Sequence, residues 1–232
     1  MGDANNGVND NNDDIVNNVG DTHMTGTLTP MQTRPRRYHH GDLPAALLAR
    51  AEETLREKGS AALSLRELAR DLGVSHTAPS RHFADKQALL DALALVGYER
   101  MTEAMVASQV DAGESCRKRL EAMVRAYVGF CLDNAELLNL MCSIKHDPQA
   151  SKALLEAAGR WSELIERLVA EGQRQGEVRE GSHERICVPV FATVHGFANL
   201  AATGMLAPET VEHGLDEVIA FILRGCAPDG PA

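Results

Sequence analysis

The chain has 232 residues, of which 44% are hydrophobic, 4% aromatic and 24% charged, and its formal net charge is −10. No apolar run approaches the roughly 18 residues of a membrane span, and no basic-then-apolar signal peptide opens the sequence, so we expect a cytoplasmic protein with no membrane partner. Five cysteines without a C-x-x-C pair favour free thiols in a reducing compartment, and we expect neither a metal site nor a cofactor.

Residues 1–33 are rich in Asn and Asp, contain no Lys or Arg and carry a charge of −5. Few apolar side chains are present to repay the entropy of ordering, so we predict an acidic, disordered tail. Residues 34–100 carry a charge of +2, although the whole chain is acidic. Arg34, Arg36 and Arg37 are candidates for an arm that contacts DNA phosphates or a minor groove; the alternative is a solvated tail.

A first helix is predicted over residues 42–58. Asp42 is suited to cap its N-terminus, and Gly59 is suited to end it. An apolar side chain recurs every fourth residue, at Leu43, Leu47, Ala51 and Leu55. This spacing predicts one buried face that packs across the helices that follow.

The segment SLRELARDLGVSHTAPSRHF, residues 64–83, has the pattern of two short helices joined by a tight turn. A capping box at Ser64 starts the first helix. Gly73 can adopt the left-handed conformation that ends it, and Ser75 can cap the second helix. Pro79 falls within or just beyond the first turn of that helix, where at most one backbone hydrogen bond is lost. The pattern predicts a helix-turn-helix whose second helix enters the major groove of DNA.

The position of a residue along this motif predicts whether it contacts a base edge or a phosphate of the DNA. Candidates for the base edges are His76, Thr77 and Arg81. Candidates for the phosphates are Ser64, Ser75, Ser80, His82 and Lys86. The alternative is an ordinary helical hairpin, because short glycine turns join helices in many bundles.

From residue 85 onward the apolar periodicity predicts only helices. The first opens at Asp85, runs to about residue 110 and connects the motif to a larger C-terminal part. Further helices are expected at about 115–133, 135–145, 148–175, 182–205 and 208–224. The chain has no glycine-rich phosphate loop, H-E-x-x-H motif or nucleophile motif, so we do not expect an enzyme.

The helices after residue 115 carry Met, Phe and Trp side chains that suit a pocket for an irregular apolar molecule. Candidate ligand-binding residues are Tyr127, Phe130, Met141, Trp161, Phe191, His195 and Asn199. The alternative is that these side chains only build the core of a helical bundle. A further alternative is a thiol or metal sensor, because Cys142 lies near His146 and Cys187 near His195 in the sequence.

The run RYHHGDLPAALLARAEETLREKGSAALSLRELARDLGVSHTAPSRHFADKQALLDAL, residues 37–93, resembles the DNA-binding region of the tetracycline-repressor (TetR) family of bacterial transcription regulators. YHHGDL and the VHG sequence at residues 194–196 also resemble a branch whose C-terminal domain is named for a Trp-His-Gly motif, with Phe191 at the position of the tryptophan. Ser80 departs from the family, which usually has a tyrosine there that contacts a DNA phosphate.

The resemblance implies an all-α fold with a helix-turn-helix domain at residues 34–88, an effector-binding and dimerisation domain at 89–226, and a tail at 227–232. It implies a homodimer formed through the last two helices, whose apolar residues exceed the needs of one core face. It also implies a repressor that a small-molecule effector releases from operator DNA. Because of Ser80, the alternative is a dimeric small-molecule-binding protein, or a thiol or metal sensor, with weak or lost DNA binding.

Overall fold

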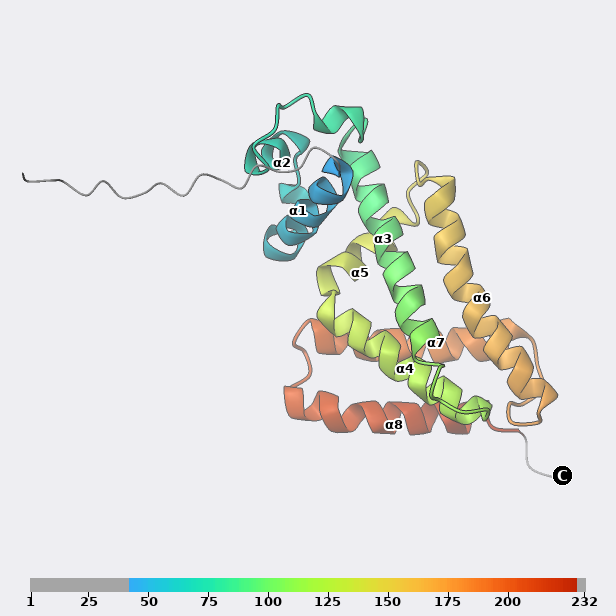
Figure 1. Ribbon diagram of the computed structural model, residues 1–232. Helices are drawn as coiled ribbons and strands as arrows, with labels where there is room; N and C mark the ends of the chain where they lie inside the picture. Colours follow the sequence, from blue (N-terminus) through green and yellow to red (C-terminus); the bar gives the residue numbers. More distant parts are fainter. Residues whose placement is uncertain (1–41, 229–232) are drawn as a thin grey trace, which may run out of the picture. The chain divides into compact units, whose positions relative to one another are not determined.

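A computed structural model describes residues 42–228 of the chain (Figure 1). This part is all-helical, as predicted, with eight α-helices, two short 3-10 helices and no strand among the described residues. In chain order the helices are α1 (Leu43–Lys58), η1 (Ser60–Ala62), α2 (Leu65–Asp71), η2 (Pro79–Arg81), α3 (Lys86–Ala107), α4 (Cys116–Asp133), α5 (Ala135–Ile144), α6 (Lys152–Arg174), α7 (His183–Ala202) and α8 (Pro208–Cys226).

The predicted start and end of α1 are confirmed. The side chain of Asp42 accepts a hydrogen bond from the amide of Ala45 at 3.4 Å, which satisfies one free N–H of the first turn. Gly59 ends the helix with a φ of +76°, a conformation that glycine adopts without a steric penalty. Leu47 and Leu55 are buried and join α1 to the core.

The long helix α3 contacts α1 as well as α4, α5 and α6 (Figure 1). Asp85 caps it by accepting the amide of Ala88 at 2.9 Å, as its position in the sequence predicted. Gly97 allows α5 to approach closely, because a Cβ atom there would lie 2.5 Å from the sulfur of Met141. The predicted domain boundary between residues 88 and 89 falls inside the first turn of α3, and it stays a prediction.

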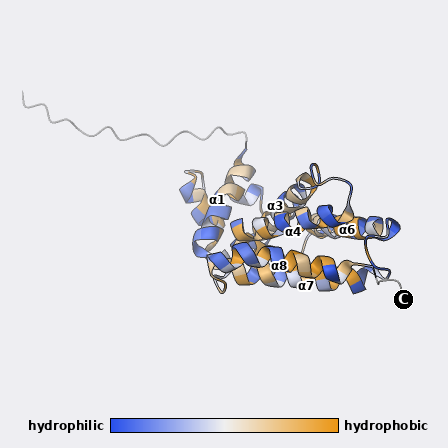
Figure 2. Ribbon diagram, turned by 90° about the horizontal axis from the view of Figure 1, so that it is seen from below, coloured by the Kyte–Doolittle hydropathy of each residue, from blue (hydrophilic) through white to orange (hydrophobic). Residues whose placement is uncertain are grey.

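Helices α7 and α8 lie side by side, and both contact α4 (Figure 2). Each helix buries apolar side chains on one side and leaves others exposed, among them Val188 at 61% and Phe221 at 60%. By length and composition α7 is able to cross a membrane, and it is the only described helix that is. However, α7 contains the polar residues His195 and Asn199, and it packs against three other helices of the bundle.

Candidate DNA interface and ligand cavity

The first helix of the predicted DNA-binding motif is α2, which buries Leu68 and Ala69 against the core. Ser64 is its N-cap residue by position and has an extended backbone. Its hydroxyl makes no capping hydrogen bond, and the Glu67 carboxylate lies 3.9 Å from the Arg70 guanidinium. The predicted capping box is therefore wrong, although the predicted helix start is right.

The turn after α2 has the two hydrogen bonds of a Schellman motif. The amide of Gly73 donates to the carbonyl of Arg70 at 3.1 Å, and the amide of Val74 donates to the carbonyl of Ala69 at 3.0 Å. This geometry requires a left-handed residue between the helix end and Val74, and Gly73 has a φ of +68°. The predicted role of Gly73 in the turn is confirmed.

The second element of the motif differs from the prediction. Instead of an α-helix from Ser75 onward, the chain forms a turn at His76 and Thr77 and then the 3-10 helix η2. Pro79 has no N–H to donate to the carbonyl of Ser75, and that carbonyl is bonded by the amide of Ala78 at 2.9 Å. The tighter i-to-i+3 pattern replaces the α-helical one at this point.

Pro79 and Phe83 are buried and anchor this segment to the core. The polar side chains around these anchors are turned outward as a consequence. Those that the structure leaves exposed are Ser75, His76, Thr77, Ser80, Arg81 and His82. A surface hollow of about 820 Å³ lies beside α2 and the residues just before it, 61–64, and Arg66 and His76 are among its lining residues.

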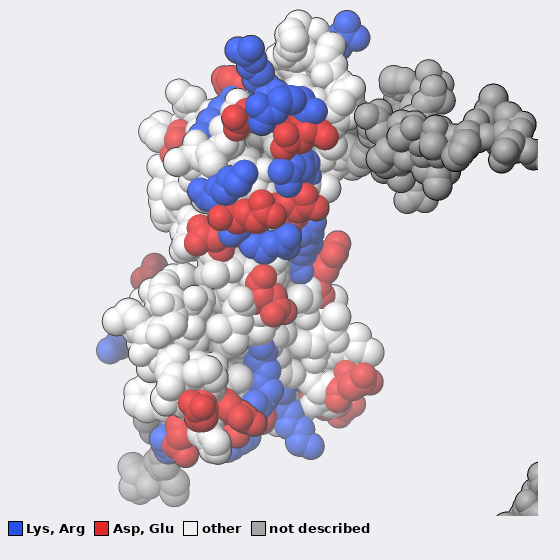
Figure 3. All heavy atoms as spheres, turned by 90° about the vertical axis from the view of Figure 1, so that its left-hand side faces the viewer, with Lys and Arg blue, Asp and Glu red and all other residues white. Residues whose placement is uncertain are grey.

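Basic side chains gather at the end of the molecule that carries α1 and α2, but they alternate with acidic ones (Figure 3). Much of this charge is paired within the protein: Arg50 lies 2.9 Å from Asp71, and Arg100 lies 2.6 Å from Glu52. Arg66 and Arg81 are exposed and form no ion pair with another described residue. These two guanidinium groups are therefore available to an external anion.

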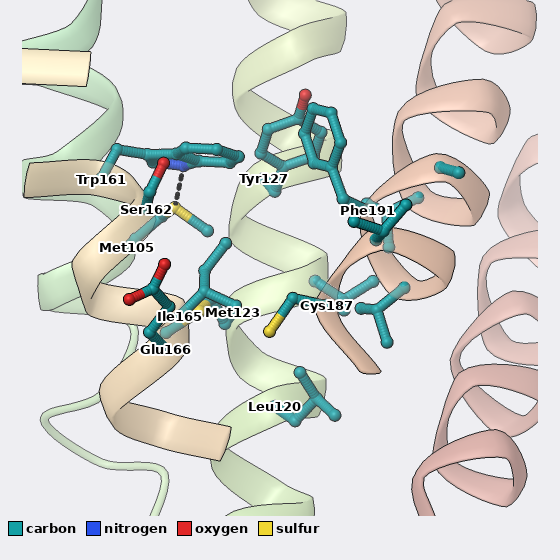
Figure 4. A pocket seen from close by; sticks show the side chains of 15 residues that line it. Met105, Leu120, Met123, Tyr127, Trp161, Ser162, Ile165, Glu166, Cys187 and Phe191 are labelled. Atoms are coloured by element: carbon teal, nitrogen blue, oxygen red, sulfur yellow. Dashed lines mark hydrogen bonds between the residues drawn. The ribbon is translucent and has the colours of Figure 1, made fainter. Parts of the chain in front are cut away.

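A second cavity, of about 270 Å³, lies in the C-terminal part of the chain between α3, α4, α6 and α7 (Figure 4). Its walls are mainly aliphatic, aromatic and sulfur-containing. The lining residues are Met105, Leu120, Met123, Val124, Tyr127, Trp161, Ser162, Ile165, Glu166, Cys187, Val188, Val190, Phe191, Ala192 and Val194.

Three aromatic rings form one wall of this cavity. The Trp161 ring centroid lies 6.1 Å from that of Tyr127 and 5.3 Å from that of Phe191. The Tyr127 hydroxyl is hydrogen-bonded to Nδ1 of His195 at 2.9 Å, and the His195 ring stacks on Phe191. Burial raises the pKa of Tyr127 far above its ordinary value, so the phenol is neutral in this wall.

Comparison with known proteins agrees with this arrangement of a motif followed by a helical bundle. Residues 47–93 match the model described as bacterial regulatory proteins, tetR family, and residues 120–224 match the tetracyclin repressor-like C-terminal domain. The chain belongs to the TetR family. It is therefore a DNA-binding transcription regulator, and the described motif is its helix-turn-helix.

Solved structures of similar proteins share the fold of this TetR-family regulator. A protein of unknown function from Rhodococcus sp. RHA1 is 46% identical, with a TM-score of 0.76 over 83% of this chain and 99% of that one. PfmR, a TetR family transcriptional regulator from Thermus thermophilus, is 23% identical, with a TM-score of 0.62 over 77% of this chain and 97% of its own. No curated protein matches the chain in a sequence comparison.

The regulator brings together only some of the residues predicted to bind DNA or ligand. Of the DNA candidates, Ser64 and Lys86 are half-buried, and the Lys86 ammonium donates to the carbonyl of Ala61 at 3.0 Å. Arg34, Arg36 and Arg37 lie outside the described residues. Sequence reasoning missed Arg66, although a basic residue in the first turn of the first motif helix was a usable signal.

Of the ligand candidates, Tyr127, Trp161 and Phe191 line the cavity, and His195 is bonded to one of them. The remaining three are not among the lining residues. Phe130 and Met141 are buried elsewhere in the core, where Met141 fills the space beside Gly97, and Asn199 is exposed.

Several lining residues were not predicted, including Met105, Glu166 and Cys187. The apolar stripe of α4 and the four-residue spacing of Trp161 and Ile165 on α6 indicated two of the walls. However, nothing local in the sequence shows that these stripes meet the end of α3. Among residues 42–228, no group of three His, Cys, Asp or Glu side chains is placed to hold a metal ion.

Proposed function

We propose that this TetR-family regulator is a repressor that leaves its operator when a small molecule binds the cavity between α3, α4, α6 and α7. The observation that supports this proposal is the position of α3. Met105, near its C-terminal end, lines the cavity, and Lys86, at its start, directly follows the DNA-binding segment. A single helix of 22 residues thus connects the two sites.

The coupling works only if the ligand distinguishes two arrangements of the bundle. A ligand that wedges Met105 and α6 apart favours an orientation of α3 that differs from the DNA-bound one. The contacts of α3 with α1 transfer that orientation to the motif. A helix of this length spans about 33 Å, so a small rotation at the cavity is amplified at the DNA.

The proposed active form is a homodimer through α7 and α8. These helices and the loop between them expose several large apolar side chains, and such a concentration on one surface is typical of a protein–protein interface. The exposed apolar side chains are Val188, Phe191, Leu200, Met205 and Phe221. A two-fold axis along this surface presents two motifs to one face of DNA, about one helical turn apart.

On DNA, we assign His76, Thr77 and Arg81 to base edges because their side chains are exposed on the segment after the turn. We assign the phosphate contacts to Arg66 and to the five predicted candidates, Ser64, Ser75, Ser80, His82 and Lys86. The proposal has four further parts. The domain boundary lies between residues 88 and 89, and the chain belongs to the Trp-His-Gly branch of the family. The protein is cytoplasmic and has no catalytic activity.

A second function is supported by one observation. The segment assigned to the bases is a turn at His76 and Thr77 followed by the 3-10 helix η2, on which Ser80 is exposed, so both its geometry and its phosphate contact depart from the pattern expected of the family. This combination favours a dimeric ligand-binding protein with weak DNA affinity. DNA binding measured across a salt series separates the two functions.

The test is fluorescence anisotropy of the protein with its own upstream intergenic DNA and with a scrambled duplex. We expect selective binding that weakens steeply with salt. Arg81→Ala should lower operator affinity about tenfold to a hundredfold, with a smaller loss on the scrambled duplex. Arg117→Ala is the matched control, because it removes one guanidinium group from an exposed residue in the first turn of α4, beyond the end of α3 that lies opposite the motif, and it should change neither affinity.

Equal losses of Arg81→Ala on both duplexes would refute the assignment of Arg81 to a base edge. Weak and unselective binding by the unmodified protein, even at low salt, would support the second function instead. Release from the operator is tested separately, by adding compounds that bind the cavity to the preformed complex. A bound compound that leaves operator affinity unchanged would refute the coupling through α3.

A further inference from the structure

The cavity between α3, α4, α6 and α7 has one charged side chain among its 15 lining residues, Glu166. No Lys, Arg or His among residues 42–228 lines it. Figure 4 shows Glu166 one helical turn after Ser162 on α6, with its carboxylate directed toward Ser162 and the Trp161–Met105 pair. Glu166 is therefore the one charged group among the lining residues, and it lies on the solvent-exposed side of the cavity.

The neutral polar groups of the cavity already have partners within the protein. The Tyr127 hydroxyl is bonded to His195, and the Trp161 indole N–H donates to the sulfur of Met105 at 3.0 Å. The Ser162 hydroxyl donates to the carbonyl of Ala158 at 3.4 Å. A polar ligand that relied on these groups would have to break existing hydrogen bonds.

Glu166, in contrast, forms no ion pair or side-chain hydrogen bond with any of residues 42–228. The residues three and four positions away on α6 are Ser162, Glu163, Val169 and Ala170, none of which is basic. Glu166 is exposed, so water screens part of its charge, but the charge still reaches the cavity wall at Cys187. Burial raises the pKa of the Cys187 thiol, and the negative charge of Glu166 raises it further.

The aromatic wall suits the apolar part of a ligand. Aromatic side chains prefer offset-stacked or edge-to-face contacts with another ring. Trp161, Tyr127 and Phe191 are clustered in the cavity with the Glu166 carboxylate at its edge. A carboxylate ligand would find no positive partner there and would be repelled by Glu166.

We propose that the cavity selects small aromatic or branched apolar molecules that carry a protonated amine, with the ammonium group beside Glu166. This inference rests on the proposed ligand-binding role of the cavity. The volume of about 270 Å³ is close to the lower end for small-molecule sites, so the ligand has one ring rather than several. Organic anions of the same size should bind more weakly than the amines, because Glu166 repels them.

Trp161 is the only tryptophan of the chain, so quenching of its fluorescence reports on the cavity without a label. The probes are 4-phenylbutylamine, 4-phenylbutanol and 4-phenylbutyrate, which share a skeleton and differ in charge. We expect the amine to bind about threefold to tenfold more tightly than the alcohol, and the carboxylate to bind most weakly. Glu166→Gln should abolish the preference of the amine over the alcohol.

Glu163→Gln is the matched control, because Glu163 is exposed on the same helix but does not line the cavity. It should retain the preference for the amine. Equal binding of amine and alcohol, tighter binding of the carboxylate, an amine preference that survives Glu166→Gln, or no quenching by any probe would each overturn the inference. These titrations contain no DNA. They therefore test ligand selectivity independently of whether a bound ligand releases the protein from its operator.

Discussion

At the scale of single residues, the hydrogen bond between Tyr127 and His195 is a polar contact that joins the cavity wall on α4 to α7. The oxygen-to-nitrogen distance is 2.9 Å, and the tyrosine is buried. A second buried tyrosine, Tyr98, donates to the carbonyl of Met141 at 3.5 Å, which is the outer limit of a hydrogen bond. The two residues form a natural pair for comparing a short and a long hydrogen bond in the same core.

Tyr127→Phe keeps the aromatic ring but removes the hydroxyl and leaves Nδ1 of His195 without its partner. We expect a loss of about 1–2 kcal/mol in the free energy of unfolding, measured by urea denaturation. Tyr98→Phe removes the weaker bond and should cost about 0.5 kcal/mol or less, because the carbonyl of Met141 remains bonded within its helix. Equal losses in the two variants would show that the bond to His195 contributes nothing specific.

At the scale of elements, Gly73 is the residue on which the turn of the DNA-binding motif depends. Its φ of +68° strains any residue with a Cβ atom, although nothing lies within 4 Å of the position that this atom would occupy. Gly73→Ala should therefore lower the free energy of unfolding by about 1 kcal/mol through backbone strain alone. The measurement is urea denaturation followed by circular dichroism.

Gly159→Ala is the control for this substitution. Gly159 lies inside α6 with helical backbone angles and also has open space around its Cβ position. Alanine there should raise the free energy of unfolding by about 0.5–1 kcal/mol, because glycine loses more entropy in a helix. A stabilised Gly73→Ala variant would contradict the left-handed turn.

Local sequence signals predicted the helices well because caps, glycine breaks and apolar periodicity act over a few residues. Asp42, Asp85 and Gly73 all have the roles that these signals indicate. The prediction was wrong where a tertiary contact decides the conformation. Pro79 is fully buried, and the loss of its N–H combined with that burial favours a 3-10 helix over an α-helix.

The cavity was predictable only in part for a related reason. Its aromatic residues stood out in the sequence, and Tyr127, Trp161 and Phe191 do line it. The wall formed by Met105 and the charge of Glu166 depend on which sides of α3 and α6 face each other across the bundle. No spacing within one helix contains that information.

At the scale of the whole molecule, the ligand cavity and the apolar surface of α7 share residues. Val188 and Phe191 line the cavity and are also exposed, at 61% and 38%. Phe221 on α8 is exposed at 60%, and α8 packs beside α7. A partner chain that covers this surface would therefore lie next to the ligand, so that dimer geometry and ligand occupancy influence each other.

Phe221→Glu tests this surface, because it places a charge where the proposed homodimer buries an aromatic ring. We expect dimer dissociation to increase at least about tenfold in analytical ultracentrifugation, since central aromatic residues dominate interface energies. Operator affinity should fall in parallel, because two linked motifs bind more tightly than one. Leu155→Glu is the control: Leu155 is exposed at 48% on α6, away from α7 and α8, and its replacement should leave the dimer intact. If Leu155→Glu dissociated the dimer and Phe221→Glu did not, the interface would lie on α6 and the proposed two-fold arrangement of the motifs would be wrong.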